Sequence, residues 1–366
     1  MQGNIPKTMH AVLLTGFGGF DKLDYRTDIT VPTPDKNEVL VRVGAAGVNN
    51  TDINTRIGWY SKSVNADTNR GGADGFDTAN PDDTGWQGGP LSLPRIQGAD
   101  CCGRIVAVGK DVDEARIGQR VIVRPMLRTY VDYRPLESWY LGSECDGSFA
   151  QYVKAPSRET YTVACDWTDA ELASVPCAYS TAENLLHKAS LSRAERVLIT
   201  CASGGVGSAA VQLAKRRGAK VVAVANSSKT EALLALGADR VIPRGDSILA
   251  TLGHNAVDVV VDLVAGTQFK ELIDTLKRGG RYAVAGAIAG PVVELDVRTL
   301  YLKDLTFLGC TFQDDIVFDN LVKYIERGEI RPLVARTYPL KDIVAAQKDF
   351  LAKKFLGKLV LLTDSG

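Results

Sequence analysis

The residues with the clearest chemical potential form a glycine-rich turn, Ala202-Ser203-Gly204-Gly205-Val206-Gly207. An apolar run over 196–200 precedes the turn and a helical pattern follows it. In that setting Gly204 lets backbone N–H groups approach a pyrophosphate, and Gly207 lets the helix pack on the strand. The helix N-terminus adds partial positive charge. We therefore predict a dinucleotide site rather than a purely structural turn. Its predicted residues here and on neighbouring segments are Thr181, Ser203, Gly204, Gly205, Val206, Gly207 and Gly286.

The end of the second predicted strand bears on which dinucleotide is bound. NAD sites place Asp or Glu there, about 20 residues after the glycines, to bind the ribose 2′-OH. Here Asn226 ends the strand and is followed by Ser227, Ser228 and Lys229. No carboxylate repels a 2′-phosphate, two hydroxyls and an ammonium can bind it, and Arg244 after the third strand can reach it. We predict NADPH; NADH and a solvated Lys229 are the alternatives.

These residues need a scaffold, and the second half of the chain predicts one. After a helical pattern over 168–187, strands alternate with helices. The strands cover 196–200, 220–225, 239–242, 257–262, 281–286 and 305–309, and the helices lie near 206–217, 229–236, 267–277 and 316–327. This alternation predicts an α/β fold with a doubly wound parallel sheet of the Rossmann type. Shorter strands are expected before it, and a last strand over 358–362.

A segment of another character interrupts the first half. Residues 59–95 are rich in Gly, Asp and Asn and show little periodicity. This segment is far longer than the usual loop of about 4–6 residues. Trp59, Tyr60, Phe76 and Trp86 offer anchoring groups. We expect an ordered lid, with a disordered segment as the alternative.

Composition excludes several classes of partner. The 366 residues include 43 Lys+Arg and 43 Asp+Glu, so the net charge is zero, and we expect no nucleic-acid partner. No apolar run approaches the roughly 20 residues that a membrane span needs, and we expect no membrane partner. The seven scattered cysteines suit reduced thiols, and no signal peptide pattern is evident. A cytoplasmic protein with a small-molecule substrate is expected.

Several motifs carry a family resemblance: Gly47-Val48-Asn49-Asn50-Thr51-Asp52, the glycine turn, Leu236-Gly-Ala-Asp, and Gly357-Lys358. Together they resemble the medium-chain dehydrogenase/reductase superfamily, closest to its zinc-lacking quinone oxidoreductase and enoyl reductase branch. The resemblance implies a GroES-like, mainly β catalytic domain split around a Rossmann domain. The implied divisions are 1–165 with an insertion at 61–92, then 166–312, then a return over 313–366. It also implies a homodimer or homotetramer, paired through Leu305–Cys310.

The resemblance raises the question of zinc. Zinc alcohol dehydrogenases of this family place ligands where the chain has Asn49, Gly98-Ala99-Asp100 and Cys177. Catalytic zinc needs three protein ligands, and one cysteine cannot supply them. We therefore predict no metal site and interpret Cys177 as a buried thiol near the cofactor.

Without a Lewis acid, the expected reaction begins with hydride delivery to an electrophilic carbon. We predict NADPH-dependent reduction of a quinone or an activated C=C bond, in an enone or an enoyl thioester. Carbonyl reduction or alcohol oxidation, and a non-catalytic NADPH-binding protein, are the alternatives.

The resemblance also implies roles for residues near the first motif. Tyr60 matches the proton-donating Tyr of mitochondrial-type enoyl thioester reductases, with a lid anchor as its alternative role. Asn49 is expected to face the nicotinamide or substrate. For Asp52 a catalytic role and the holding of local backbone N–H groups are both open. Arg56 is expected at the surface, with binding of an anionic substrate as the alternative.

Overall fold

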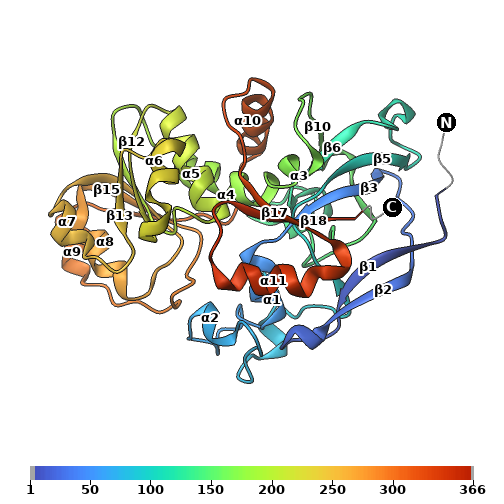
Figure 1. The fold of residues 1–366 in the computed structure, drawn as a ribbon, viewed down its shortest axis with the longest axis horizontal. Helices are drawn as coiled ribbons and strands as arrows, with labels where there is room; N and C mark the ends of the chain where they lie inside the picture. Colours follow the sequence, from blue (N-terminus) through green and yellow to red (C-terminus); the bar gives the residue numbers. More distant parts are fainter. Residues whose placement is uncertain (1–4, 364–366) are drawn as a thin grey trace.

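Six parallel strands form one sheet in the computed structural model, which describes residues 5–363 (Figure 1). The strand order is β13-β12-β11-β14-β15-β16, so the predicted α/β doubly wound sheet is confirmed. Its strands are β11 (Arg196–Ile199), β12 (Lys220–Ala225), β13 (Arg240–Pro243), β14 (Val257–Asp262), β15 (Leu276–Val284) and β16 (Thr306–Gly309). The accompanying helices are α4 (Pro176–Lys188), α5 (Gly205–Arg216), α6 (Thr230–Leu236), α7 (Ile248–Leu252), α8 (Phe269–Thr275), α9 (Val297–Leu302) and α10 (Asp315–Glu326).

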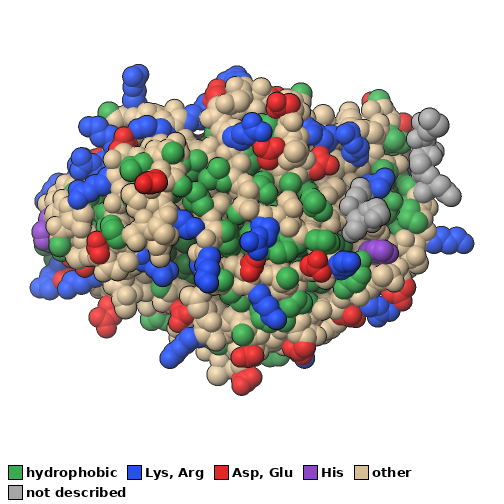
Figure 2. Space-filling view, in the orientation of Figure 1, with side chains coloured by type: hydrophobic (Ala, Val, Ile, Leu, Met, Phe, Trp, Pro, Cys, Tyr) green, Lys and Arg blue, Asp and Glu red, His purple; other side chains and the backbone are tan. Residues whose placement is uncertain are grey.

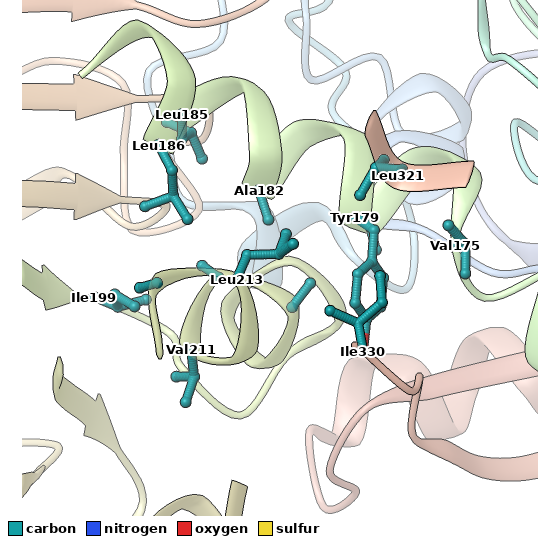
Figure 3. Close-up of a cluster of buried hydrophobic side chains, with 14 of the residues drawn as sticks. Val175, Tyr179, Ala182, Leu185, Leu186, Ile199, Val211, Leu213, Leu321 and Ile330 are labelled. Carbon is teal, nitrogen blue, oxygen red and sulfur yellow. The ribbon is translucent and has the colours of Figure 1, made fainter. Parts of the chain in front are cut away.

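The largest hydrophobic core lies where α4 and α5 pack together against this sheet (Figure 3). Leu186 of α4 and Leu213 of α5 are fully buried with Ile199 of β11. Leu321 of α10 belongs to the same cluster, and α10 packs on α4. This helix, which the sequence division placed in the returning segment, thus shares its core with the parallel sheet.

The helix expected over 168–187 is two helices instead. The structure has α3 (Asp169–Leu172) and then α4, which begins at Pro176. Proline lacks the N–H that a helix interior needs, and its ring clashes with the preceding turn, so it is favoured at a helix start. Thr168 accepts a hydrogen bond from the Glu171 N–H and caps α3.

The remaining strands build a mainly β lobe. Its seven-stranded sheet runs β10-β6-β5-β3-β18-β17, and β9 also pairs with β3. Strand β18 returns from the far end of the sequence to lie between β3 and β17. The strands of this sheet are β3 (Glu38–Gly47), β5 (Cys102–Val108), β6 (Arg120–Val123), β9 (Tyr152–Pro156), β10 (Thr160–Thr162), β17 (Val334–Pro339) and β18 (Lys358–Leu362). Smaller sheets combine β1 (Thr8–Leu14), β2 (Leu23–Thr30) and β4 (Arg95–Ile96), and β7 (Met126–Leu127) with β8 (Trp139–Tyr140). The helices of this lobe are α1 (Asn50–Arg56), α2 (Thr68–Gly71), α3 and α11 (Ile343–Ala352).

The segment over 59–95 is anchored at several points. It contains α2 and a short 3-10 turn, Pro81–Asp83. The indole N–H of Trp59 donates to the Ala66 carbonyl at 3.0 Å. The Thr68 N–H donates to the Ile288 carbonyl of the other lobe at 3.1 Å, and Figure 1 shows α2 at the junction of the two lobes. The insertion therefore bridges both halves of the molecule.

Arg56 lies beneath this segment, and the expectation of a surface role is wrong. Its guanidinium is fully buried and donates to the Gly18 carbonyl at 2.6 Å, to the Gly72 carbonyl at 2.7 Å and to Gln347 Oε1 at 2.8 Å. Its ring partner is Phe20, 4.4 Å from the guanidinium carbon. Because it is fully buried and each of its three nitrogens donates to a protein acceptor, Arg56 fastens the insertion to α1 and α11 and is not available to an anionic substrate.

Charged side chains of both signs are interspersed over the face in Figure 2, as the zero net charge leads one to expect. Within residues 5–363, no helix combines the length and the apolar character that crossing a membrane requires. All seven cysteines are free thiols.

Candidate active site

The predicted cofactor residues gather at one edge of the parallel sheet. Ser203 follows β11, Asn226 ends β12, Arg244 follows β13 and Gly286 follows β15. Since the carboxyl ends of parallel strands share one edge, these segments lie together where α/β proteins bind ligands. Thr181 lies on α4, half-buried.

The glycine turn shows which of its glycines the protein itself requires. A Cβ on Gly207 would collide with the Cys201 carbonyl and lie 2.6 Å from the Ala202 Cα, so the packing of α5 demands glycine there. A Cβ on Gly204 would meet Cys201 only at ordinary contact distances of 3.5 Å. Gly204 is also the N-cap of α5 and provides no side-chain cap. The first N–H groups of the helix therefore remain open to an anion, and the turn fits a pyrophosphate.

The turn also contacts the other lobe. The Gly357 N–H donates to the Ser203 carbonyl at 3.1 Å, and a Cβ on Gly205 would lie 2.7 Å from Lys358 Cδ. The predicted pyrophosphate loop and the start of β18 are thus direct neighbours.

In the segment expected to bind a 2′-phosphate, Asn226, Ser227 and Ser228 are exposed and Lys229 is half-buried. Asn226 Oδ1 accepts from the Ser228 N–H at 3.0 Å and begins a 3-10 turn over Ser227–Lys229. Lys229 Nζ donates to the Lys354 carbonyl of the other lobe at 2.6 Å. Arg244 is exposed, and its charge lies near Cys201, where it acts to lower the thiol pKa against the larger effect of burial.

Asp262, at the end of β14, has a positioning role that sequence reasoning missed. Its buried carboxylate accepts from the hydroxyls of Thr200 at 2.6 Å and Tyr282 at 2.5 Å, and from the N–H groups of Val264 and Ala265. It thereby fixes the loop after β14 beside the glycine turn. The sequence signal for this role is an acidic residue at the end of a buried apolar strand.

A buried polar network occupies the other side of the site. Lys358 Nζ donates to Asp100 Oδ2 at 2.8 Å, Asn49 Oδ1 at 2.5 Å and the Val48 carbonyl at 3.0 Å. Asn49 Nδ2 in turn donates to Asp100 Oδ2 at 2.8 Å. Asp100 Oδ1 accepts from the Cys177 N–H at 2.6 Å. Both the oxygen and the nitrogen of the Asn49 side-chain amide are therefore hydrogen-bonded within the network. The sequence indicated Lys358 only as part of a family motif.

Asp52 sits next to this network and serves α1. Its Oδ2 accepts from the Asn49 N–H at 2.8 Å. Burial raises the pKa of this carboxyl to about 7; the nearby Asp100 charge adds to the increase, while backbone N–H groups and Lys358 oppose it. The observed contact is the local backbone role considered from the sequence.

Tyr60 lies on the same side of the site, after the end of α1. Its hydroxyl donates to Thr51 Oγ1 at 3.0 Å, and its ring meets Trp59 edge-on at 5.7 Å. Burial raises the pKa of Tyr60 to about 12, with smaller contributions from the nearby Cys177 and Asp52. The phenol therefore keeps its proton at neutral pH.

The residues at the zinc-ligand positions do not fit a zinc ion. Asn49 is bound by Lys358 and Asp100, Ala99 has no donor atom, and Cys177 Sγ lies 3.0 Å from the Tyr140 hydroxyl. Burial raises the pKa of the Cys177 thiol to about 12. In the described part of the chain, no group of three or more His, Cys, Asp or Glu is placed to hold a metal.

Comparison with known proteins agrees with this architecture. Residues 35–164 match the alcohol dehydrogenase GroES-like domain, residues 205–327 match the zinc-binding dehydrogenase family, and residues 159–244 match the TrkA-N domain. The chain is 28% identical to a quinone oxidoreductase from Lama guanicoe, covering 97% of this chain and 98% of that protein. It is also 28% identical to an acryloyl-coenzyme A reductase from Metallosphaera sedula, covering 92% and 95%.

Solved structures extend the likeness to three dimensions. A protein of Sinorhizobium meliloti 1021, provisionally named an alcohol dehydrogenase, is 45% identical with a TM-score of 0.87, and 98% of each chain is covered. A mycobacterial protein in complex with NADPH is 26% identical with a TM-score of 0.75, covering 97% of this chain and 100% of that one.

The raised pKa of Asp52 predicts a pH dependence of stability. The unfolded chain loses this proton near the ordinary carboxyl pKa of about 4, and the folded protein near 7. The contribution of Asp52 to stability therefore falls as pH rises through this window and is constant above it. Asp52→Asn retains an acceptor for the Asn49 N–H but cannot ionise. Relative to the parent, its free energy of unfolding should gain up to about 1.4 kcal/mol per pH unit between pH 4 and 7.

Urea unfolding of both proteins across that range measures this difference. Asp111→Asn, at an exposed position, is the control and should run parallel to the parent. A difference between Asp52→Asn and the parent that does not vary with pH would contradict the raised pKa.

Proposed function

The chain belongs to the medium-chain dehydrogenase/reductase superfamily, and on that basis we propose that it is a zinc-independent, NADPH-dependent reductase of quinones or activated C=C bonds. The observation that carries the proposal is the buried network in which Lys358 and Asp100 bind Asn49, a residue at one of the positions that correspond to zinc ligands. The quinone oxidoreductase and acryloyl-coenzyme A reductase relatives support the choice of substrate class.

The residues at the carboxyl edge of the sheet would hold the cofactor. Members of this superfamily bind a nicotinamide nucleotide. When bound, it supplies hydride. The turn over 203–207 would hold the pyrophosphate at the open N-terminus of α5. Asn226, Ser227, Ser228, Lys229 and Arg244 would surround the 2′-phosphate.

Tyr60 would supply the proton that completes the reduction. Its O–H is protonated at neutral pH and is hydrogen-bonded to Thr51, which is half-buried and can return a proton from solvent. Asn49 and Asp52 would be positioning residues, because their polar atoms are engaged with the network and with α1.

Tyr60→Phe should lower turnover about 10²–10⁴-fold, because it removes a positioned acid and little else. Purified protein in the presence of a chelator would be assayed with NADPH against enones, enoyl thioesters, quinones and aldehydes, and NADPH binding would be followed by fluorescence. The affinity for NADPH should not change. Tyr25→Phe, whose hydroxyl contacts only His10 among its described neighbours, should behave as the parent.

The proposal fails if the parent reduces none of the enones, thioesters or quinones. Aldehyde turnover that depends on stoichiometric zinc would support a carbonyl reductase instead. Undiminished turnover of Tyr60→Phe would remove Tyr60 from the reaction.

The preference for NADPH rests on the absence of an acid from the Asn226–Lys229 segment and on the two cations beside it. A mycobacterial relative of similar fold binds NADPH. The Lys229 ammonium has one carbonyl partner, so two of its three donors can reach a phosphate.

Lys229→Ala combined with Arg244→Ala should raise the Kd for NADPH by roughly 10²-fold, because charge-assisted hydrogen bonds to the phosphate are lost. The Kd for NADH should not change, since it lacks that phosphate. Lys323→Ala with Arg327→Ala removes the same charge from α10 and is the control. Equal losses for both nucleotides would show that the phosphate binds elsewhere.

We also propose that the protein forms a homodimer, or a tetramer built from such dimers, through β16. This strand is at the edge of the parallel sheet, and beside it α9 exposes Val297, Tyr301 and Leu302 by 56–60%. An unpaired strand edge next to exposed apolar side chains is suited to a second copy.

Sedimentation equilibrium should give at least twice the chain mass, and Phe307→Lys on β16 should reduce it. A parent of single-chain mass at micromolar concentration would contradict this proposal.

A further inference from the structure

A second phenol, that of Tyr140, lies beside Cys177. Tyr140 ends β8 and is buried with Ala99, Met126 and Cys177 in a small apolar cluster. Its hydroxyl is 3.0 Å from Cys177 Sγ. Cys177 also contributes to the raised pKa of Tyr60, and Tyr60 contributes slightly to that of Tyr140, so both phenols belong to the neighbourhood of Cys177.

The hydroxyl of Tyr140 has an unusually weak partner for a buried group. Buried tyrosine hydroxyls normally find an oxygen or nitrogen partner, and a thiol is both a poor donor and a poor acceptor. Burial, with the nearby Cys177 as a smaller cause, raises the pKa of Tyr140 well above its ordinary value. The O–H therefore stays protonated and can turn toward a better acceptor.

The other donors around the site are already committed. Lys358 has three N–H donors and three acceptors in contact, namely Val48, Asn49 and Asp100. The Asn49 amide donates to the Gly47 carbonyl and to Asp100. Redirecting either group to a substrate would leave a buried carboxylate short of partners, which is costly.

The ring of Tyr140 is held in place from two sides. Trp86 of the insertion stacks on it, with ring centroids 4.5 Å apart and planes inclined by 26°. The Tyr140 N–H donates to Glu144 Oε2 at 2.8 Å, and the neighbouring Gln87 side chain donates to the Ser138 carbonyl at 2.5 Å. The hydroxyl is thus presented from a fixed ring, which is what a preorganised donor requires.

From this geometry we propose that Tyr140 is a second catalytic residue, the hydrogen-bond donor that holds the carbonyl oxygen of a conjugated substrate while Tyr60 supplies the proton. The inference rests on the proposed function. As a hydride adds to the β-carbon, the C=C electron pair moves toward the α-carbon and the carbonyl electrons move onto oxygen, forming an enolate. The Tyr140 O–H donates to that oxygen without losing its proton. The Tyr60 O–H bond then breaks, the α C–H bond forms, and Tyr60 regains a proton from solvent through Thr51.

The test uses the full chain without nicotinamide and the chromophoric enal 4-(dimethylamino)cinnamaldehyde. A hydrogen bond to its carbonyl oxygen shifts its absorption to longer wavelength. The parent should produce this shift, and Tyr140→Phe, which retains the ring and its stacking on Trp86, should bind the enal and lose most of it. Cys177→Ala should retain it, and so should Tyr130→Phe, a matched control whose hydroxyl contacts Glu38 instead. 3-Fluorotyrosine at position 140, a stronger acid, should increase the shift.

With NADPH, Tyr140→Phe should also lower kcat/KM for enones about 10²–10³-fold. An unchanged shift in Tyr140→Phe, a shift lost in Cys177→Ala alone, or no shift with the parent would each overturn the role of Tyr140. If the parent reduces no enone or quinone but the shift still depends on Tyr140, the proposed function fails while the donor assignment stands. Should Tyr140→Phe not fold, a shift that does not respond to 3-fluorotyrosine would still overturn the proposal.

Discussion

The buried ion pair between Lys358 and Asp100 joins three parts of the chain that are remote in sequence. Lys358 begins β18, Asp100 precedes β5, and Asn49 between them caps α1. Two charges taken out of water are tolerated only where each finds its full set of partners, and here the ammonium has three acceptors. Removing either partner would leave an unpaired buried charge, at a cost of about 3–5 kcal/mol. The positions of α1, of the α4 N-terminus and of the glycine turn all depend on this pair.

Elements with a strong local pattern could be predicted from the sequence. The parallel sheet follows from short β-branched runs alternating with helical stretches, and β12 and β14 have the bounds predicted for them. The helix over 168–187 was mispredicted because its periodicity continues across Pro176, and local chemistry overrides periodicity there. The burial of Arg56 could not be predicted from the sequence either, since it depends on an insertion that folds back over this side chain.

The residues of the candidate site likewise fall into those that a local sequence pattern predicts and those that only the fold brings together. The glycine turn and the Asn226–Lys229 segment are contiguous in sequence, so their chemistry is visible in a short stretch. Tyr140 and Lys358 reach the site from segments that lie 80 or more residues from Tyr60, and a single sequence contains no signal that brings them together. Gly204 and Gly207 look equivalent in the motif, yet only the second is required by packing. Gly207 thus serves the fold, whereas the packing leaves Gly204 free for the cofactor role that we propose for it.

The placement of β18 inside the seven-stranded sheet has a consequence for how the molecule forms during synthesis. Every strand of the parallel sheet lies before residue 310, so this sheet can pair before the last fifty residues are synthesised, although α10 joins its core only afterwards. The mainly β lobe cannot close then, because β18 fills the gap between β3 and β17 and its pairing spans more than 300 residues. Such long-range pairing is slow, and until it occurs Asp100 has no lysine beside it. The candidate site would therefore be the last part of the protein to form, and a chain that lacks β18 would not have a complete site.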